Sequence, residues 1–347
     1  PGHNSVYFNQ SQQISLAELK IACRDFASPC ENIRSVVVAG VEYITFESAE
    51  PITPKDLAIL ARLSFVYAVF AAVQDGAAAP DGEKLLFAPV AAVKNTFMDE
   101  KISSIFKYPG KTNTDFTRMM INVALHSSKF RDEPHIELLD PVAGKGTTLF
   151  EGLVYGFNVS GIEIGQDAVH EACVFFKKNL ELEKYKHTYS KRKLPKHDKT
   201  PTATSYEFTM AHTKAEFKQP QTTKKLTFIA GNSSAASRHF KKSKFHVIVG
   251  DLPYGVAHGN VTKERQPSAS RTRNPSELLS ACLPAWHDVL RKGGVLVLAF
   301  NSFVLSRADI SALLQNNGFT VFTDSPYDEF EHHVDRAIKR DIVVAQK

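Results

Sequence analysis

From residue 136 onward, short apolar segments of the chain alternate with longer segments in which apolar residues recur at helical spacing. The apolar segments cover residues 136–140, 157–164, 226–231, 245–250, 293–300, 319–322 and 337–346. The segments with helical spacing cover residues 147–156, 166–185, 276–292 and 307–318. Strands of this length alternating with helices predict a parallel, doubly wound sheet of the α/β class. Ligands bind such sheets beyond the carboxyl ends of the strands, so the residues that follow each apolar segment are candidates for a site.

A glycine-rich turn follows the first of these strands. It reads Asp140-Pro-Val-Ala-Gly-Lys-Gly146 and leads directly into a segment with helical spacing. The turn lacks the Gly-Lys-Ser/Thr of a phosphate-binding P-loop, and Leu149 stands where a dinucleotide-binding motif has its third glycine. Glu163 ends the next strand, where its carboxylate is placed to accept both ribose hydroxyls of a nucleoside. An ordinary strand-to-helix turn is the alternative.

An adenosine ligand without a phosphate-binding loop indicates S-adenosylmethionine, whose sulfonium and amino-acid portion need no such loop. Asn232 and Ser233 follow the third strand and either reach the adenine or cap a helix. Upstream, residues 110–125 predict a helix for which Asn113 or Thr114 is the candidate N-cap. Free backbone N–H groups at the start of that helix could hold the methionine carboxylate, and a plain cap is the alternative.

The fourth strand ends in Asp251-Leu-Pro-Tyr-Gly255, an unusual way to leave a buried strand. An exocyclic amine of a nucleobase is a poor nucleophile because its lone pair is delocalised into the ring. Hydrogen bonds from the amine to the Asp251 carboxylate and the Leu252 carbonyl would localise that lone pair toward a methyl donor. Pro253 would fix the backbone so that this carbonyl points outward, and Tyr254 would stack on the base. The amine sheds its proton after attack, so no strong general base is required.

In content and order these segments resemble the class I methyltransferases that act on exocyclic amino groups. Residues 110–125, the Asp140–Gly146 turn, the DLPYG segment and the closing residues 334–347 follow one another as in the RNA methylase family that contains tRNA guanosine-N2 methyltransferases, a THUMP-associated group. The resemblance covers about residues 100–347 and implies a Rossmann-like, seven-stranded methyltransferase sheet with S-adenosylmethionine as cofactor. Leu252 is closer to the guanosine-N2 group than to the Asp-Pro-Pro-Tyr pattern, which adenine-N6 enzymes share.

The resemblance also implies which residues hold the ligands. Those implied to bind the cofactor are Thr114, Phe116, Asp140, Ala143, Gly144, Gly146, Thr147, Glu163, Ile164, Asn232, Ser233 and Asp251. Those implied to act in catalysis are Asp251, Leu252, Pro253 and Tyr254. The expected function is methylation of the exocyclic amino group of an RNA base, guanosine N2 in tRNA. An adenine-N6 methyltransferase on DNA or RNA and a catalytically silent RNA-binding subunit stay open as alternatives.

The first hundred residues have a different pattern. Strands are expected at 5–8 and 85–90, a hairpin at 35–48, and helices at 15–26 and 54–73. This order predicts a small α+β domain at about residues 5–95 on a split-βαβ plan, ahead of the methyltransferase domain at 100–347. The segment is too short for the full ferredoxin-like and THUMP pair of some family members, so a reduced RNA-binding domain is expected.

The net charge of +5 hides a local excess of positive charge. Residues 184–225 hold 11 Lys and Arg against 3 Asp and Glu, so this segment is net +8 and the rest of the chain is net −3. The segment lacks helical periodicity, which predicts a flexible basic insertion that contacts RNA phosphates; a solvated loop without a role is the alternative. The residues expected to bind RNA are Lys191, Arg192, Lys193, Lys196, Lys241, Lys242, Arg271 and Arg273. The expected partners are RNA, specifically tRNA, and a small activating protein.

Other functional classes lack support in the sequence. The four cysteines form no Cys-x-x-Cys pair and the 13 histidines show no metal-binding spacing, so neither a disulfide framework nor a metal site is expected. No apolar run approaches the ~18 residues that span a bilayer, and no signal peptide is recognisable. No membrane partner and a cytoplasmic location are therefore expected.

Overall fold

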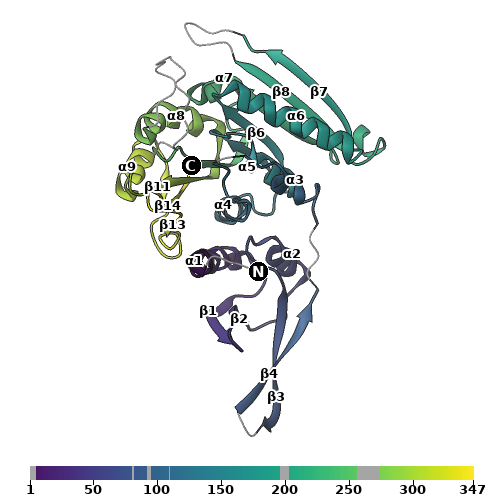
Figure 1. Cartoon of the computed structure of the whole chain (residues 1–347), viewed down its shortest axis with the longest axis vertical. Helices are drawn as coiled ribbons and strands as arrows, with labels where there is room; N and C mark the ends of the chain where they lie inside the picture. The colour runs from purple at the N-terminus through teal and green to yellow at the C-terminus, as the bar shows by residue number, and fades with distance from the viewer. Residues whose placement is uncertain (1–4, 80–81, 92–94, 109, 196–202, 256–273) are drawn as a thin grey trace.

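The structure is a computed structural model that describes residues 5–79, 82–91, 95–108, 110–195, 203–255 and 274–347. Figure 1 shows a large sheet at the centre of the structure. The sheet is mixed, with the strand order β12-β14-β11-β10-β5-β6-β9-β8-β7. In that order the strands are Thr320–Val321, Lys339–Gln346, Leu290–Asn301, Phe245–Asp251, Glu137–Asp140, Asn158–Glu163, Lys224–Ala230, Thr204–Ala211 and Lys186–Lys193, and the short β13 (His332–His333) pairs with β14. Strands β11, β10, β5, β6 and β9 are parallel, and β14 is antiparallel to β11. The expected α/β, Rossmann-like sheet is confirmed.

Helices cover both faces of this sheet (Figure 1). The helices on one face are α4 (Thr114–Ser127), α5 (Thr147–Val154) and α6 (Gln166–Leu182), and those on the other are α7 (Ala236–His239), α8 (Pro275–Val289) and α9 (Arg307–Asn316). In β11, Val295 and Val297 lie in the core between the sheet and α4 to α6. Leu296 and Leu298 lie in the core between the sheet and α7 to α9. Successive side chains of a strand point to opposite faces, so a strand buried on both faces is continuously apolar. Within the described residues no helix combines the length and apolar character needed to cross a membrane.

The strand order reverses beside β5. The chain leaves β5 through α5 and enters β6 on one side, whereas β10, which comes later in the sequence, pairs with the other side of β5. The turns after β5 and β10 therefore emerge next to each other at the carboxyl edge of the sheet. Doubly wound sheets bind ligands at this position.

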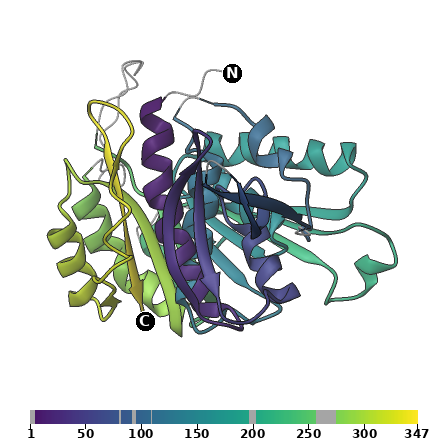
Figure 2. The same ribbon diagram turned by 90° about the horizontal axis from the view of Figure 1, so that it is seen from below.

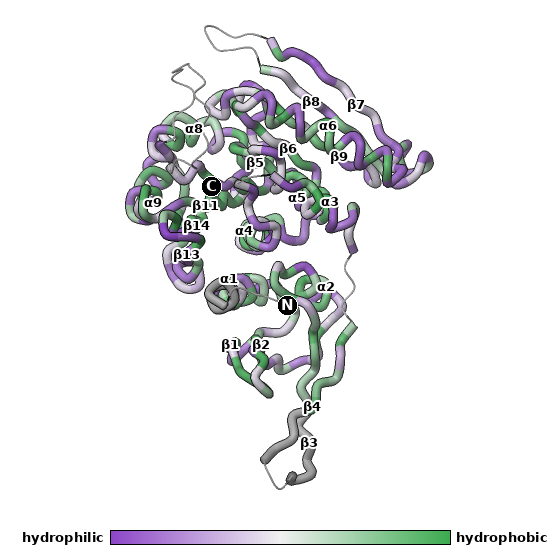
Figure 3. Tube along the Cα trace, in the orientation of Figure 1, coloured by the Kyte–Doolittle hydropathy of each residue, from purple (hydrophilic) through white to green (hydrophobic). Residues whose placement is uncertain are grey.

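Two stretches of the basic segment at 184–225 are strands of the sheet, β7 and β8, so the expectation of a flexible insertion is wrong there. They form the antiparallel hairpin β7–β8, which extends the sheet beyond β9 (Figure 1). Tyr206, Phe208 and Met210 of β8 are buried in the core beneath α6. Their alternation with polar residues is a strand pattern, which the neighbouring lysines and threonines obscure. Strand β7 is hydrophilic along its length and largely exposed (Figure 3).

The N-terminal segment also differs from expectation. Residues 5–8 begin the helix α1 (Ser5–Ala22) and do not form a strand. The apolar run at 54–73 divides into α2 (Pro54–Arg62) and the start of β3, because a run without a clear period does not distinguish a helix from a strand. Among the described strands, β1 (Cys30–Val38) pairs with β2 (Val41–Ser48), and β3 (Val69–Ala79) pairs with β4 (Gly82–Val90). The predicted hairpin and the last strand are confirmed, but two separate hairpins replace the split-βαβ sheet.

Helix α1 joins this segment to the large sheet. Ile14, Ala17 and Ile21 lie in the core that also contains α4, whereas Leu19 packs with Leu60 in a smaller cluster next to the hairpins. Figure 2 shows α1 beside the C-terminal part of the chain, drawn in green and yellow. Helix α1 contributes to both clusters, so packing does not separate the first 95 residues from the large sheet. A separate domain at about residues 5–95 stays a prediction.

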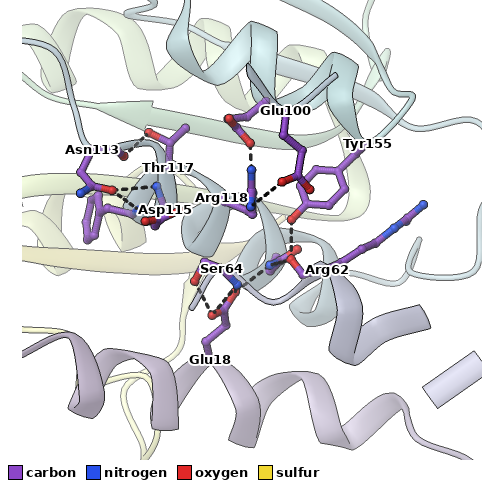
Figure 4. Close-up of polar contacts among 12 residues, drawn as sticks. Glu18, Arg62, Ser64, Glu100, Asn113, Asp115, Thr117, Arg118 and Tyr155 are labelled. Atoms are coloured by element: carbon purple, nitrogen blue, oxygen red, sulfur yellow. Dashed lines mark hydrogen bonds and ion pairs between the residues drawn. The ribbon is translucent and has the colours of Figure 1, made fainter. Parts of the chain in front are cut away.

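A buried carboxylate lies where α1 meets α4. Glu18 is 2% exposed and accepts hydrogen bonds from the Ser64 N–H at 3.2 Å, from Ser64 Oγ at 2.5 Å and from Asn122 Nδ2 at 2.6 Å (Figure 4). Burial raises the pKa of Glu18 to about 7 despite these hydrogen bonds. A carboxyl group with a raised pKa holds its proton more tightly in the folded state, so stability is lost as the pH rises through that pKa.

We expect Glu18→Gln to flatten the pH dependence of the free energy of unfolding. The wild-type protein should lose roughly 3 kcal/mol more than the variant as the pH rises from 4.5 through 7. Urea unfolding at a series of pH values measures this difference. Glu31→Gln, at an exposed position in β1, is the matched control and should follow the wild type. Equal pH dependence in Glu18→Gln and the wild type would contradict the assignment.

Candidate active site

The turns after β5 and β10 line one cavity of about 340 Å³. Asp140 and Gly144 lie on its wall from the first turn, and Asp251 lies on it from the second. Tyr108 and Thr112, from the segment that leads into α4, complete the wall. Three segments far apart in the sequence thus meet where the strand order reverses.

The turn after β5 is held by backbone hydrogen bonds and two left-handed glycines. The Ala143 N–H donates to the Ile162 carbonyl at 2.9 Å, and the Gly146 N–H donates to the Ala143 carbonyl at 2.7 Å. Gly144 has a φ of 52° and Gly146 a φ of 87°, values that residues with side chains rarely adopt. A Cβ built on Gly144 would meet no atom within 4 Å. The turn therefore presents bare backbone to open space, where a ligand can approach closely.

Glu163, at the end of β6, is oriented by the same turn. Its Oε2 accepts the Gly144 N–H at 3.0 Å, and its Oε1 accepts the Gly165 N–H at 2.7 Å. Each carboxylate oxygen has a second lone pair, so Glu163 can still accept hydrogen bonds from a ligand. The neighbouring Ile164 is 37% exposed; within the described residues, the wall of the cavity includes neither Glu163 nor Ile164.

Asp140 ends β5 and is almost fully buried. Its Oδ1 accepts the Val142 N–H at 3.0 Å, which shapes the start of the turn. Burial raises the pKa of Asp140 to about 7, and the negative charges of Asp251 and Glu163 contribute in the same direction. Asp140 and Asp251 thus bring two carboxyl groups to the wall of the cavity, which Lys145 also lines.

Both carboxylate oxygens of Asp251 accept hydrogen bonds. Thr112 Oγ1 donates to Oδ2 at 2.5 Å, and the Tyr254 hydroxyl donates to Oδ1 at 2.6 Å. Burial raises the pKa of Asp251, and the nearby positive charge of Arg340 is the largest influence that lowers it. These contacts fix the direction of the carboxylate and leave one lone pair on each oxygen.

The other residues of the DLPYG turn differ in exposure. Leu252 is buried, and its N–H donates to the Ala299 carbonyl at 2.9 Å, whereas Pro253 is exposed. Tyr254 is partly buried, and its carbonyl accepts a hydrogen bond from Asn301 Nδ2 at 3.3 Å. Tyr254 therefore has a structural contact with Asp251 in addition to the stacking role expected for its ring.

Arg340 lies on β14, and no motif in the sequence around it predicts a site residue. Its guanidinium lies 4.4 Å from the ring centroid of Phe116 and 5.4 Å from that of Tyr254. Arg340 is 5% exposed, and its Nε and Nη1 have no hydrogen-bond partner within the described residues. The only signal in the sequence is a basic residue inside the apolar run that ends the chain. A buried cation thus lies next to the Tyr254 ring of the DLPYG turn.

At the start of α4 the structure shows a plain cap. Asn113 Oδ1 accepts the N–H groups of Asp115 at 2.7 Å and Phe116 at 3.3 Å. The Phe116 side chain is buried, and Thr114 lines a second cavity, of about 540 Å³, beside α4. Two of the N–H groups expected to hold a carboxylate are therefore bonded within the protein. Thr147, in contrast, lines the first cavity.

Asn232 and Ser233 also make contacts within the protein. Asn232 Oδ1 caps the following turn by accepting the Ser234 N–H at 2.9 Å. Ser233 Oγ donates to the Pro141 carbonyl at 2.6 Å and accepts a hydrogen bond from Trp286 Nε1 at 3.0 Å. Ser233 thereby ties the turn after β9 to the glycine-rich turn.

The basic residues of β7 lead to the edge of the sheet where the cavity lies. In the register of the sheet, Lys193 is opposite Thr204, Thr204 is opposite Ala230, and Ala230 is opposite Glu163. Lys191 and Arg192 precede Lys193 on the same strand. This strand end therefore lies at the level of the site, three strands away from Glu163.

The other residues expected to contact RNA lie elsewhere. Lys241 and Lys242 precede β10 and therefore lie at its amino end, on the opposite edge of the sheet from Asp251. Lys196, Arg271 and Arg273 lie outside the described residues.

No family model matches the chain, and no curated protein matches its sequence. The comparison with solved structures finds TrmN from Thermus thermophilus, at 13% identity and a TM-score of 0.39, with 71% of this chain and 51% of that chain covered. It also finds a magnesium protoporphyrin IX methyltransferase from Synechocystis PCC 6803 with bound S-adenosylmethionine, at 14% identity, a TM-score of 0.36 and coverage of 69% and 86%. A candidate RNA methyltransferase from Pyrococcus horikoshii has 16% identity, a TM-score of 0.37 and coverage of 73% and 92%. This chain spans about half of the length of TrmN.

Proposed function

We propose that the chain is an S-adenosylmethionine-dependent methyltransferase that methylates the exocyclic amino group of an RNA base, guanosine N2 in tRNA. The shared cavity carries the proposal, because the glycine turn at Gly144 and the Asp251 carboxylate both line it. Groups held on these two turns would therefore meet inside one cavity. Positioning of this kind contributes strongly to a transfer reaction, since effective molarities for well-oriented groups reach about 10⁵ M or more.

The residues around Gly144 fit S-adenosylmethionine, which supplies an electrophilic methyl group on a sulfonium ion when it is bound. The open space at Gly144 admits a ligand against the backbone, and Glu163 has lone pairs left for ribose hydroxyls. Ile164 offers an apolar contact for the adenine. Asp140 and Asp251 both line the cavity, and an ionised carboxylate there attracts the positively charged sulfonium.

Asp251 fits the amine of the acceptor base. The Thr112 and Tyr254 hydroxyls each occupy one lone pair of the carboxylate, so the remaining lone pairs can accept an amine N–H. A hydrogen bond to the ionised carboxylate draws the amine lone pair out of conjugation with the ring. The carboxylate must be ionised for this role, and Arg340 supplies the positive charge that favours ionisation.

We expect Arg340→Met to move the acid limb of the pH–rate profile to higher pH. Transfer should fall as the pH drops through the pKa of Asp251, which burial raises and Arg340 lowers. Loss of the cation should raise that pKa further and shift the limb to higher pH. Single-turnover methyl transfer across the acid and neutral range measures the shift. Arg340→Lys keeps the charge and should shift less. An unmoved limb in Arg340→Met would show that Arg340 does not act on Asp251.

The end of β7 is proposed to contact RNA phosphates. Lys191→Glu combined with Lys193→Glu should weaken RNA binding and reduce the slope of log K against log salt by about 2, because each phosphate contact contributes about 0.9. Lys241→Glu with Lys242→Glu is the matched control, since it makes the same charge change at the opposite edge of the sheet. Filter binding to tRNA at several salt concentrations compares the two. An unchanged slope in the β7 variant would exclude the contact.

Analysis of nucleosides tests the proposed reaction. Unmodified tRNA is incubated with the protein and S-adenosylmethionine carrying a labelled methyl group, with and without cell extract to supply an activating protein, and is then digested for mass spectrometry. Labelled N2-methylguanosine is the expected product. Labelled N6-methyladenosine would keep the amine-methylating site but change the base. Binding of tRNA without any labelled nucleoside, in either condition, would contradict the proposal and leave a catalytically silent RNA-binding protein.

A further inference from the structure

We propose that Phe303 is a stacking platform for an unpaired base that neighbours the target nucleotide. The inference rests on the proposed RNA methyltransferase function and adds a substrate contact to it. Phe303 lies in the turn after β11, at the same edge of the sheet as Asp251. It is 58% exposed, and the adjacent Val304 is 46% exposed.

A single buried side chain ties this turn to the DLPYG turn. Asn301 is 2% exposed; its Nδ2 donates to the Tyr254 carbonyl at 3.3 Å and to the Ala337 carbonyl at 3.0 Å. Its Oδ1 accepts the N–H groups of Phe303 at 3.2 Å and Lys339 at 3.1 Å. The backbone of Phe303 and that of Tyr254 are therefore bonded to the same amide. The aromatic ring is held on a turn that is fixed relative to the base-binding turn.

The surroundings of Phe303 suit a nucleotide. The ring of His333, also exposed, lies 6.1 Å from the Phe303 ring between centroids, so a second flat group borders the platform. Glu331, on the same loop, is neutralised by Lys339 at 2.6 Å, and the exposed Asp335 accepts the Ala337 N–H at 2.7 Å. Arg336 is exposed, and no ion pair of its guanidinium is found within the described residues. The exposed rings of Phe303 and His333 offer a flat surface for a base, and Arg336, on the same loop as His333, is an exposed cation available to its phosphate.

The proposed reaction creates a need for such a surface. A paired or stacked base must be extruded to reach Asp251, which leaves the neighbouring bases without stacking partners. Proteins that bind unpaired RNA provide aromatic side chains for these bases, and the contact tolerates any base because every base has a π-face. Phe303 is the exposed aromatic ring that is tied to the DLPYG turn through Asn301.

Tryptophan fluorescence gives a direct test. The chain has one tryptophan, Trp286, which is fully buried, so its signal is a constant background. Phe303→Trp should be quenched when unmodified tRNA is added, because a stacked base quenches an indole. Val304→Trp, at the next exposed position, is the matched control and should be quenched much less. Heparin, a polyanion without bases, should quench neither variant.

Binding and kinetics complete the test. Phe303→Ala should raise the Kd and the KM for tRNA about ten-fold, whereas Phe303→Tyr, which keeps a ring, should stay near the wild type. The Kd for S-adenosylmethionine should not change in either variant. If wild-type protein methylates tRNA but Phe303→Trp is not quenched more than Val304→Trp, or heparin quenches it equally, the platform is excluded and the surface serves another partner, such as a protein. If wild-type protein methylates no nucleic acid, the proposed function itself fails.

Discussion

Replacing Asp251 with Ala is expected to lower the rate of methyl transfer to tRNA by about 10³-fold, comparable to the loss of one well-placed group that stabilises a transition state. The carboxylate is held by Thr112 and Tyr254 at 2.5 and 2.6 Å, so its free lone pairs point in fixed directions. Removing it takes away the acceptor of the amine N–H but leaves the glycine turn at Gly144 intact. Cofactor affinity should therefore change far less than the rate.

Single-turnover transfer and calorimetric titration with S-adenosylmethionine separate these two effects. Asp251→Asn keeps the shape of the side chain but loses the negative charge, so it should also be strongly impaired. Asp288→Ala, at an exposed position on α8, is the matched control and should transfer at the wild-type rate. Wild-type turnover by Asp251→Ala would show that the amine is held elsewhere.

Replacing Glu163 with Ala is expected to raise the Kd for S-adenosylmethionine about 100-fold, since hydrogen bonds to charged groups contribute about 1.5–3 kcal/mol each and 1.4 kcal/mol is a factor of ten. Two effects combine at this position. The variant loses the acceptor for ribose hydroxyls, and it also leaves the N–H groups of Gly144 and Gly165 without their carboxylate partner. The glycine turn should then be less well ordered for binding.

Calorimetric titration measures the affinity, and thermal unfolding shows whether the fold is retained. Glu163→Asp keeps the charge but shortens the side chain by one methylene, so it should recover only part of the affinity. Glu181→Ala, on the exposed surface of α6, is the matched control for loss of a carboxylate. An unchanged Kd in a folded Glu163→Ala protein would show that the nucleoside does not bind to Glu163.

The central sheet could be predicted because its strands are buried on both faces. Runs such as Val295 to Leu298 are continuously apolar and are bounded by glycines and helical segments. Strand β8 was missed because it is buried on one face, so Tyr206 and Phe208 alternate with polar residues in a segment dominated by charge. Strand β3 was missed because its apolar residues continue those of α2 without a change of period.

The site residues that could be predicted from the sequence are those that end a strand. Asp140, Glu163 and Asp251 each close a parallel strand, and the topology of the sheet then brings them to one edge. Thr112 and Arg340 come from segments before and after this core, and nothing in their local sequence links them to Asp251. Their contacts depend on tertiary packing, which a pattern along the chain does not contain.

A crystal structure of the protein with sinefungin, an analogue in which an amine-bearing carbon replaces the methylated sulfur, tests the central claim most directly. The predicted result is an adenosine portion against Gly144 and Glu163, with the analogue's amine directed across open space toward the Asp251 carboxylate. Reacting atoms need to approach within about 3–3.5 Å, so the space between them must admit a planar base. An analogue bound away from the glycine turn, or one whose amine faces away from Asp251, would contradict the account.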